Sequence, residues 1–128
     1  MLQTNYINTY VICLGANVPD AAQRLEDAYG VIAGFGTIVR VSSCYRTEPE
    51  YAGETVPYLN RVLAMTSEIN LEELQRTLKK YEASIRALND NCGLVNLDID
   101  IVLHNGAVLR PRDYAATYFR IGAQEIGI

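Results

Sequence analysis

The sequence contains no tryptophan, one histidine and three cysteines among its 128 residues, and each shortage excludes some chemistry. A catalytic Ser-His or Cys-His pair would have only His104 as its base. His104 ends a predicted strand in a turn, where we expect it to be exposed and not catalytic. The cysteines, Cys13, Cys44 and Cys92, are odd in number and match no zinc-ligand spacing, so we expect free thiols, as in a cytoplasmic protein.

Long apolar runs and an excess of positive charge are missing as well. No stretch approaches the roughly 18 apolar residues that would span a bilayer, and the first eight residues lack the basic and apolar segments of a signal peptide. The formal net charge is −4, whereas a nucleic-acid-binding domain normally carries a basic face. We therefore expect a cytoplasmic protein with neither membrane nor nucleic-acid partners.

The residues that are present suit a single packed domain over residues 1–128. Hydrophobic residues make up 49% of the chain and charged residues 20%, which allows a sizeable core. The length is that of one domain, and neither a repeat nor a linker-like segment divides it.

The spacing of apolar residues predicts two helices and four strands. Apolar positions recur every three or four residues over 21–35 and 71–88, the pattern of an amphipathic helix. Asn70 and Glu73 are typical of a capping box at the start of the second helix, and the segment 89–93 breaks that helix. The predicted strands are Thr9–Leu14, Thr37–Thr47, Pro57–Ile69 and Leu94–Leu103. A turn at 105–106, a loop at 110–112 and a helix over 113–123 are expected beyond them.

The resulting order, βαββαβ with a C-terminal extension, predicts an α+β, ferredoxin-like fold. Its antiparallel sheet would carry both helices on one face and leave the other face for a ligand or a partner.

Two aspartates interrupt the apolar strand Leu97–Leu103. Because alternate residues of a strand share a face, Asp98 and Asp100 would stand together, opposite the core. Paired carboxylates repel each other unless a cation lies between them, which favours a Mg²⁺ site. The alternative is two aspartates on a solvated sheet face.

Glu82 lies on the second predicted helix, one residue after the apolar Tyr81. We expect its carboxylate to be solvated, and the alternative is that it is a buried partner of the two aspartates.

Tyr58 and Asn60 lie two residues apart on the third predicted strand, so they too share a face. An aromatic ring beside an amide suits a planar heterocycle, which the ring can stack on while the amide donates and accepts hydrogen bonds. Thr47, at the end of the second strand, would form a lip of the same face. The alternative is that these are ordinary polar residues of a sheet surface.

Taken in chain order, five segments resemble the motifs of the 6-hydroxymethyl-7,8-dihydropterin pyrophosphokinase family. They are Val11–Asn17, Val41–Pro49, Pro57–Asn60, Leu97–Ile101 and Gln124–Ile126. The resemblance is colinear over residues 9–126.

This resemblance implies an ATP-dependent transferase of folate biosynthesis, which moves pyrophosphate from ATP to the hydroxymethyl group of a dihydropterin. It implies that Asp98 and Asp100 bind two Mg²⁺ ions and take part in catalysis. It also implies that Thr47 and Asn60 hydrogen-bond the pterin and that Tyr58 lines its pocket.

The chain departs from the family in its cations. The family's Arg-Trp-Gly-Pro-Arg run corresponds to Asn91–Val95, where only the glycine remains, and a later family arginine falls near Ala116–Tyr118, where an aromatic remains. The family's Pro-His corresponds to Pro111 and Arg112. We therefore expect Arg112 to contact the nucleotide and to assist catalysis, with Lys79 as a further nucleotide contact. Other candidate replacements are Arg86, Arg110 and Arg120.

Three hypotheses follow. The chain is an ATP- and Mg²⁺-dependent pterin pyrophosphokinase, or it is a catalytically impaired member of that family that binds pterin, nucleotide or a protein. The third is an unrelated ferredoxin-like domain that assembles through its open sheet face.

Overall fold

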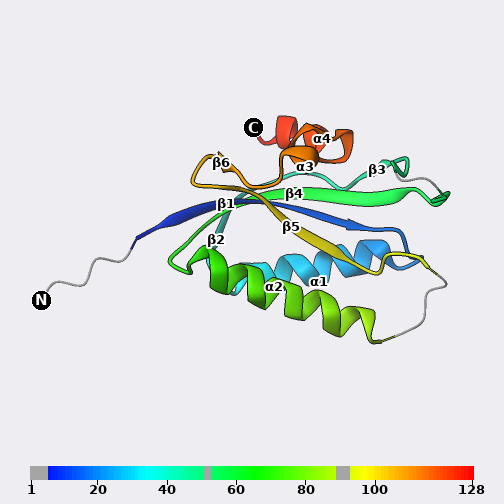
Figure 1. Ribbon diagram of the computed structural model, residues 1–128, viewed down its shortest axis with the longest axis horizontal. Coiled ribbons are helices and arrows are strands. Elements are labelled where there is room, and N and C mark those ends of the chain that lie inside the picture. The colour runs from blue at the N-terminus through cyan, green and yellow to red at the C-terminus, as the bar shows by residue number, and fades with distance from the viewer. Residues whose placement is uncertain (1–5, 51–52, 89–92) are drawn as a thin grey trace, which may run out of the picture.

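The computed structural model describes residues 6–50, 53–88 and 93–128, which form an antiparallel sheet with helices on both faces (Figure 1). The elements in chain order are β1 (Asn8–Ala16), α1 (Ala21–Ala33), β2 (Thr37–Val41), β3 (Tyr45–Thr47), β4 (Tyr58–Ser67), α2 (Leu71–Arg86), β5 (Asp98–His104), β6 (Ala107–Val108), α3 (Pro111–Ala115) and α4 (Thr117–Glu125). The α+β class and the ferredoxin-like core predicted from the sequence are confirmed.

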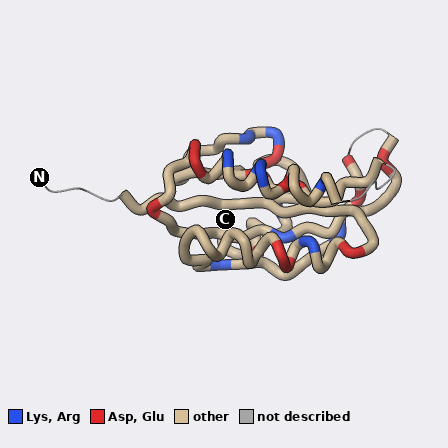
Figure 2. Tube along the Cα trace, turned by 90° about the horizontal axis from the view of Figure 1, so that it is seen from below, with Lys and Arg blue, Asp and Glu red and all other residues tan. Residues whose placement is uncertain are grey.

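The sheet order is β2-β4-β1-β5-β6, and β3 pairs with β4 beyond the end of β2. The central strand, β1, pairs along its whole length with β4, from Asn8 opposite Ser67 to Ala16 opposite Leu59. It carries no charged residue; the Lys, Arg, Asp and Glu residues marked in Figure 2 lie on the helices, on the loops and on other strands such as β5. Burial on both faces explains this composition.

The main core lies between the sheet and the two long helices, α1 and α2, which cover the same face (Figure 1). Its fully buried large side chains include Tyr10, Ile12, Leu14, Leu25, Ile32, Leu63, Met65, Leu74 and Leu78. Each contributes about 1.5–3 kcal/mol by leaving water. The predicted cap of α2 is confirmed, because the Asn70 side chain accepts a hydrogen bond from the Glu73 backbone N–H at 2.8 Å.

The opposite face is only partly open, whereas we expected all of it to be left for a ligand or a partner. α4 packs on it and forms a second core with residues of β1, β4 and β5: Val11, Cys13, Val62, Val102, Phe119 and Ala123. Gly122 allows the close approach, since a Cβ there would lie 2.7 Å from the Tyr45 hydroxyl. The apolar face of α4 drives this packing. It also covers the surface that the assembly hypothesis required.

The second predicted strand is divided in two. The Ser42 hydroxyl accepts a hydrogen bond from the Val62 backbone N–H at 2.9 Å, in place of a backbone carbonyl of the neighbouring strand. Ser43 then turns toward α4, where its N–H and hydroxyl both donate to the carboxylate of Glu125 at 2.9 Å. These polar contacts outweigh the β-branched character of the segment.

Other boundaries differ from the prediction as well. The fourth predicted strand begins at Asp98 rather than Leu94. The predicted loop at 110–112 contains the start of α3, because Pro111 suits the first turn of a helix. The predicted helix 113–123 is two helices that meet at Ala116, whose backbone is extended. The predicted helix break at Asn89–Cys92 lies outside the described residues.

The turn at 105–106 is confirmed and joins β5 to β6, with positive φ angles at Asn105 and Gly106. His104 beside it is partly buried rather than exposed, because its ring stacks on Tyr10 at 4.9 Å and a ring nitrogen lies 2.9 Å from Asn8 Oδ1. None of the helices in the described part of the chain is long and apolar enough to cross a membrane.

Candidate functional site

A cavity of about 340 Å³ opens between α2, the ends of β3, β4 and β5, and the α3–α4 segment. Six of the seven site residues predicted from the sequence line it: Thr47, Tyr58, Asn60, Lys79, Asp98 and Asp100. The seventh, Arg112, is exposed on α3 and is not part of the lining. The fold thus gathers residues from distant parts of the sequence around one space.

One wall of the cavity is polar and rigid. Asn60 is buried on β4, and its Nδ2 donates to Thr47 Oγ1 at 2.7 Å and to the Tyr45 carbonyl at 3.3 Å. Its Oδ1 faces Gly15 of β1, where a Cβ would lie only 3.3 Å away. Because Gly15 has no side chain, the space beside the Asn60 amide stays open to the cavity. This wall therefore offers a fixed amide next to a flat backbone.

The facing wall contains the two aspartates of β5. Ile99 and Ile101 point into the main core under the helices, whereas Asp98 and Asp100 line the cavity on the other face. The expected alternation is therefore present over 98–101. Leu103, expected in the same core, packs in the second core instead, because the register between β5 and β1 shifts beside Val11 and Ile12. The pKa of Asp98 is raised from 3.8 to about 6, mainly because nearby protein displaces water from its carboxyl group although the residue stays exposed, and further by the charges of Asp100 and Glu82.

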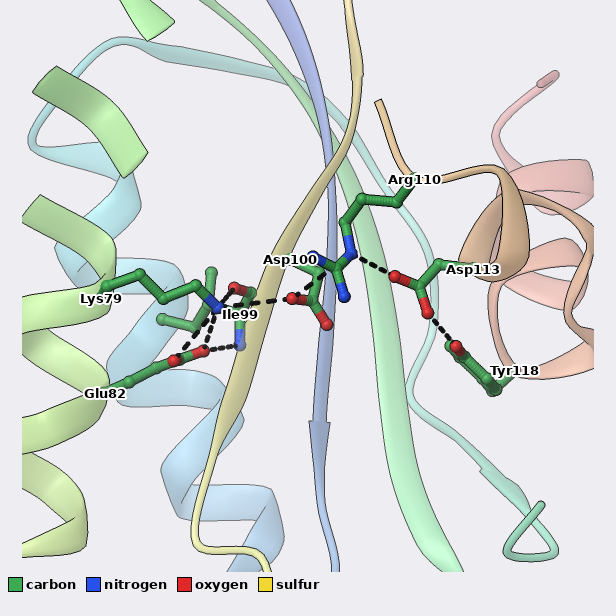
Figure 3. Close-up of polar contacts among 7 residues, drawn as sticks. All are labelled: Lys79, Glu82, Ile99, Asp100, Arg110, Asp113 and Tyr118. Carbon is green, nitrogen blue, oxygen red and sulfur yellow. Dashed lines mark hydrogen bonds and ion pairs between the residues drawn. The ribbon is translucent and has the colours of Figure 1, made fainter. Parts of the chain in front are cut away.

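Glu82 ties α2 to this strand (Figure 3). It is buried rather than solvated, which corrects the sequence-based expectation in favour of its alternative. One carboxylate oxygen accepts a short hydrogen bond from the Ile99 backbone N–H, and both oxygens lie 3.2 Å from Lys79 Nζ. Its position in the stripe formed by Leu74, Leu78 and Ile85 was the sequence signal for burial.

Lys79 and Arg110 both approach Asp100, from opposite sides (Figure 3). Lys79 Nζ lies 3.4 Å from Asp100 Oδ1, and Arg110 Nε lies 3.7 Å from the same oxygen. Arg110 is held in turn by the buried Asp113, which also accepts a short hydrogen bond from the Tyr118 hydroxyl. Sequence analysis did not assign Asp113 to the site, because its contact with Arg110 is local but only the fold places Arg110 beside Asp100 of β5.

The charges that line the cavity are unbalanced. The carboxylates are Glu48, Glu50, Glu82, Asp98, Asp100 and Asp113, and the cationic side chains are Lys79, Arg86 and Arg110. Among the described residues, six carboxylates against three cations leave a formal charge of −3, which would repel a phosphate-bearing ligand.

The donor set fits Mg²⁺ as a companion of phosphate. Within the described ranges, no three His, Cys, Asp or Glu side chains form a metal-binding group. Mg²⁺ at phosphate sites needs fewer, because it keeps several waters and binds one or two carboxylates together with the phosphates. Asp98 and Asp100 supply such a pair in a cavity with an excess of negative charge.

Comparison with known proteins gives a consistent result. The family model described as 7,8-dihydro-6-hydroxymethylpterin-pyrophosphokinase matches residues 11–124. A folate synthesis bifunctional protein of Arabidopsis thaliana is 28% identical over 106 residues, which cover 80% of this chain and 22% of the plant protein. A 2-amino-4-hydroxy-6-hydroxymethyldihydropteridine pyrophosphokinase of Porphyromonas gingivalis is 29% identical over 99 residues, which cover 73% of this chain and 67% of the bacterial protein. The chain therefore corresponds to about a fifth of the plant protein's length.

Proposed function

Because the chain belongs to the 7,8-dihydro-6-hydroxymethylpterin-pyrophosphokinase family, we propose that it transfers pyrophosphate from ATP to the hydroxymethyl group of 6-hydroxymethyl-7,8-dihydropterin. The observation that carries this proposal is the cavity in which the Asn60 amide and the Asp98–Asp100 pair line the same space. In the reaction, the hydroxyl oxygen bonds to the β-phosphorus of ATP. The bond from that phosphorus to the oxygen on the α-phosphate breaks, AMP leaves, and the hydroxyl proton is released.

The pterin is assigned to the wall formed by Asn60, Thr47 and Tyr58. A pterin is flat and has amide-like edges, which match the fixed side-chain amide of Asn60. Tyr58 and Tyr118 also line the cavity and supply aromatic surface for the ring. These residues would bind and orient the pterin so that its hydroxymethyl group faces the aspartates.

The phosphates of ATP are assigned to the wall of β5. Asp98 and Asp100 would hold Mg²⁺, whose positive charge offsets that of the carboxylates and phosphates. Lys79 and Arg110 are the preferred phosphate contacts, ahead of Arg112, because they line the cavity. Phosphoryl transfer depends mainly on such positioning and charge, since the protein forms no covalent bond to the substrate.

A second candidate function is that of a catalytically impaired binding domain. It is favoured by the segment 91–95, which holds no arginine and no aromatic residue where the family has both. Such a domain would keep the pterin wall and lose turnover.

Calorimetric titration with a non-hydrolysable ATP analogue and Mg²⁺, with and without 6-hydroxymethylpterin, tests the proposal. We expect both ligands to bind and the nucleotide to increase the affinity for pterin. Pterin binding without nucleotide binding would favour the impaired domain, and binding of neither would contradict both functions. The variant Asp98→Asn should weaken Mg²⁺-dependent nucleotide binding. Asp20→Asn serves as a control, since Asp20 lies just before α1 and does not line the cavity.

A further inference from the structure

The ammonium group of Lys79 sits where several oxygen ligands converge. Its Nζ lies 3.0 Å from the Ile99 carbonyl, 3.2 Å from each oxygen of Glu82 and 3.4 Å from Asp100 Oδ1. Two of these three partners carry negative charge, and one of them, Glu82, is buried. The side chain is still 54% exposed, so it is these oxygen contacts between α2 and β5, rather than burial, that position the ammonium beside Asp100 (Figure 3).

Asp100 is already engaged by protein cations on both sides. The same oxygen, Oδ1, that faces Lys79 also faces Arg110 Nε at 3.7 Å. A metal ion bonded to this oxygen would have an ammonium and a guanidinium as near neighbours, and like charges so close repel each other strongly. Asp98 has no cation at such a distance among the ion pairs of the described residues.

We propose that the ammonium of Lys79 supplies the charge of a second metal ion, so that this chain binds its nucleotide with one divalent cation instead of two. Asp98, which has no such cation beside it, would be the main ligand of the single ion, with Asp100 as its neighbour. This inference rests on the proposed function, because it concerns how the same cavity takes a nucleoside triphosphate. It differs from the two-ion site that the sequence resemblance implies.

The number of bound ions can be counted directly with Mn²⁺, which replaces Mg²⁺ and has an electron paramagnetic resonance signal when free. The protein is kept in excess over a non-hydrolysable ATP analogue, so that all nucleotide is protein-bound, and Mn²⁺ is titrated in. A parallel titration without nucleotide is subtracted. Calorimetry of the same samples reports whether the nucleotide is bound.

We expect one Mn²⁺ per bound nucleotide in the parent protein and two in Lys79→Gln, which removes the charge but keeps a donor for Glu82. Lys80→Gln is the matched control, since Lys80 is exposed one residue further along α2 and lies outside the cavity lining; it should retain one ion.

Two ions in the parent protein would overturn the inference and leave the proposed function intact. One ion in both the parent and Lys79→Gln would overturn the role given to Lys79. The count in the parent does not depend on any variant folding. Absence of nucleotide binding in the parent would instead contradict the proposed function itself, together with the inference that rests on it.

Discussion

The carboxylate of Glu82 accepts a hydrogen bond from the backbone N–H of Ile99, the residue between Asp98 and Asp100. This contact joins the middle of α2 to β5 near the start of the strand, where the two aspartates lie. Glu82 also contacts Lys79, so one buried side chain positions both the strand and its neighbouring cation. The geometry of the acidic pair therefore depends on a helix residue outside the β5 motif.

Removing this contact should destabilise the protein. In Glu82→Ala the Ile99 N–H loses its acceptor and Lys79 loses a partner, which costs about 1–3 kcal/mol of unfolding free energy. Urea unfolding followed by circular dichroism measures the change. Glu72→Ala, an exposed position in the first turn of the same helix, should change stability by only about 0.5 kcal/mol. Equal effects of the two substitutions would show that the hydrogen bond between Glu82 and Ile99 does not stabilise the fold.

The acidic pair should make stability depend on pH. The folded state raises the pKa of Asp98 from 3.8 to about 6, so it binds a proton more tightly than the unfolded chain does. Asp98 therefore favours folding below about pH 4, and this contribution is lost as the pH rises through about 6. At pH 8 Asp98→Asn should be more stable than the parent by about 1 kcal/mol, a value reduced for solvent screening. The difference should vanish near pH 4; a constant difference across this range would contradict the shifted pKa.

Arg110 and Arg112 provide a matched pair for the nucleotide site. Arg110 lines the cavity and is held by Asp113, whereas Arg112 is exposed on α3 outside the lining. Arg110→Gln should weaken binding of the ATP analogue about tenfold, since one charge-assisted contact to phosphate contributes roughly 1.5 kcal/mol. Arg112→Gln should change the affinity less than twofold. Calorimetry decides between them, and the reverse order would restore the assignment made from the sequence.

Two helical glycines test the packing of α4. Gly122 faces β4, and an added Cβ would lie 2.7 Å from both the Tyr45 hydroxyl and Val62 Cγ2, so Gly122→Ala should cost about 1–3 kcal/mol. Gly30 in α1 has open space around it, so Gly30→Ala should gain about 0.5–1 kcal/mol from helix propensity. Thermal unfolding measures both changes. A stabilising Gly122→Ala would mean that α4 does not pack on the sheet as described.

Local patterns account for most of the central fold. The 3–4 spacing of apolar residues and the cap at Asn70 predict α2 correctly, and the alternation over 97–101 predicts which residues of β5 face the main core. It fails at Leu103, which joins the second core because the pairing register with β1 shifts at this point. These features depend on neighbours in the sequence, so a single sequence contains the information.

The features missed by sequence analysis depend on contacts between distant segments. Whether the sheet face is open depends on α4, which packs there because Gly122 permits it and Glu125 bonds to Ser43. Which arginine enters the cavity depends on how α3 packs beside β5, where Arg110 meets Asp100. Both features are determined by tertiary packing, which helix and strand propensities of single residues do not encode.

Product analysis distinguishes pyrophosphate transfer from every other use of ATP by this chain. The purified protein is incubated with ATP, Mg²⁺ and 6-hydroxymethyl-7,8-dihydropterin, and the products are separated by chromatography. We expect AMP and pterin diphosphate in equal amounts, as pyrophosphate transfer requires, with neither formed when Mg²⁺ is removed. Absence of AMP under conditions where calorimetry shows both substrates bound, or formation of ADP in its place, would contradict it.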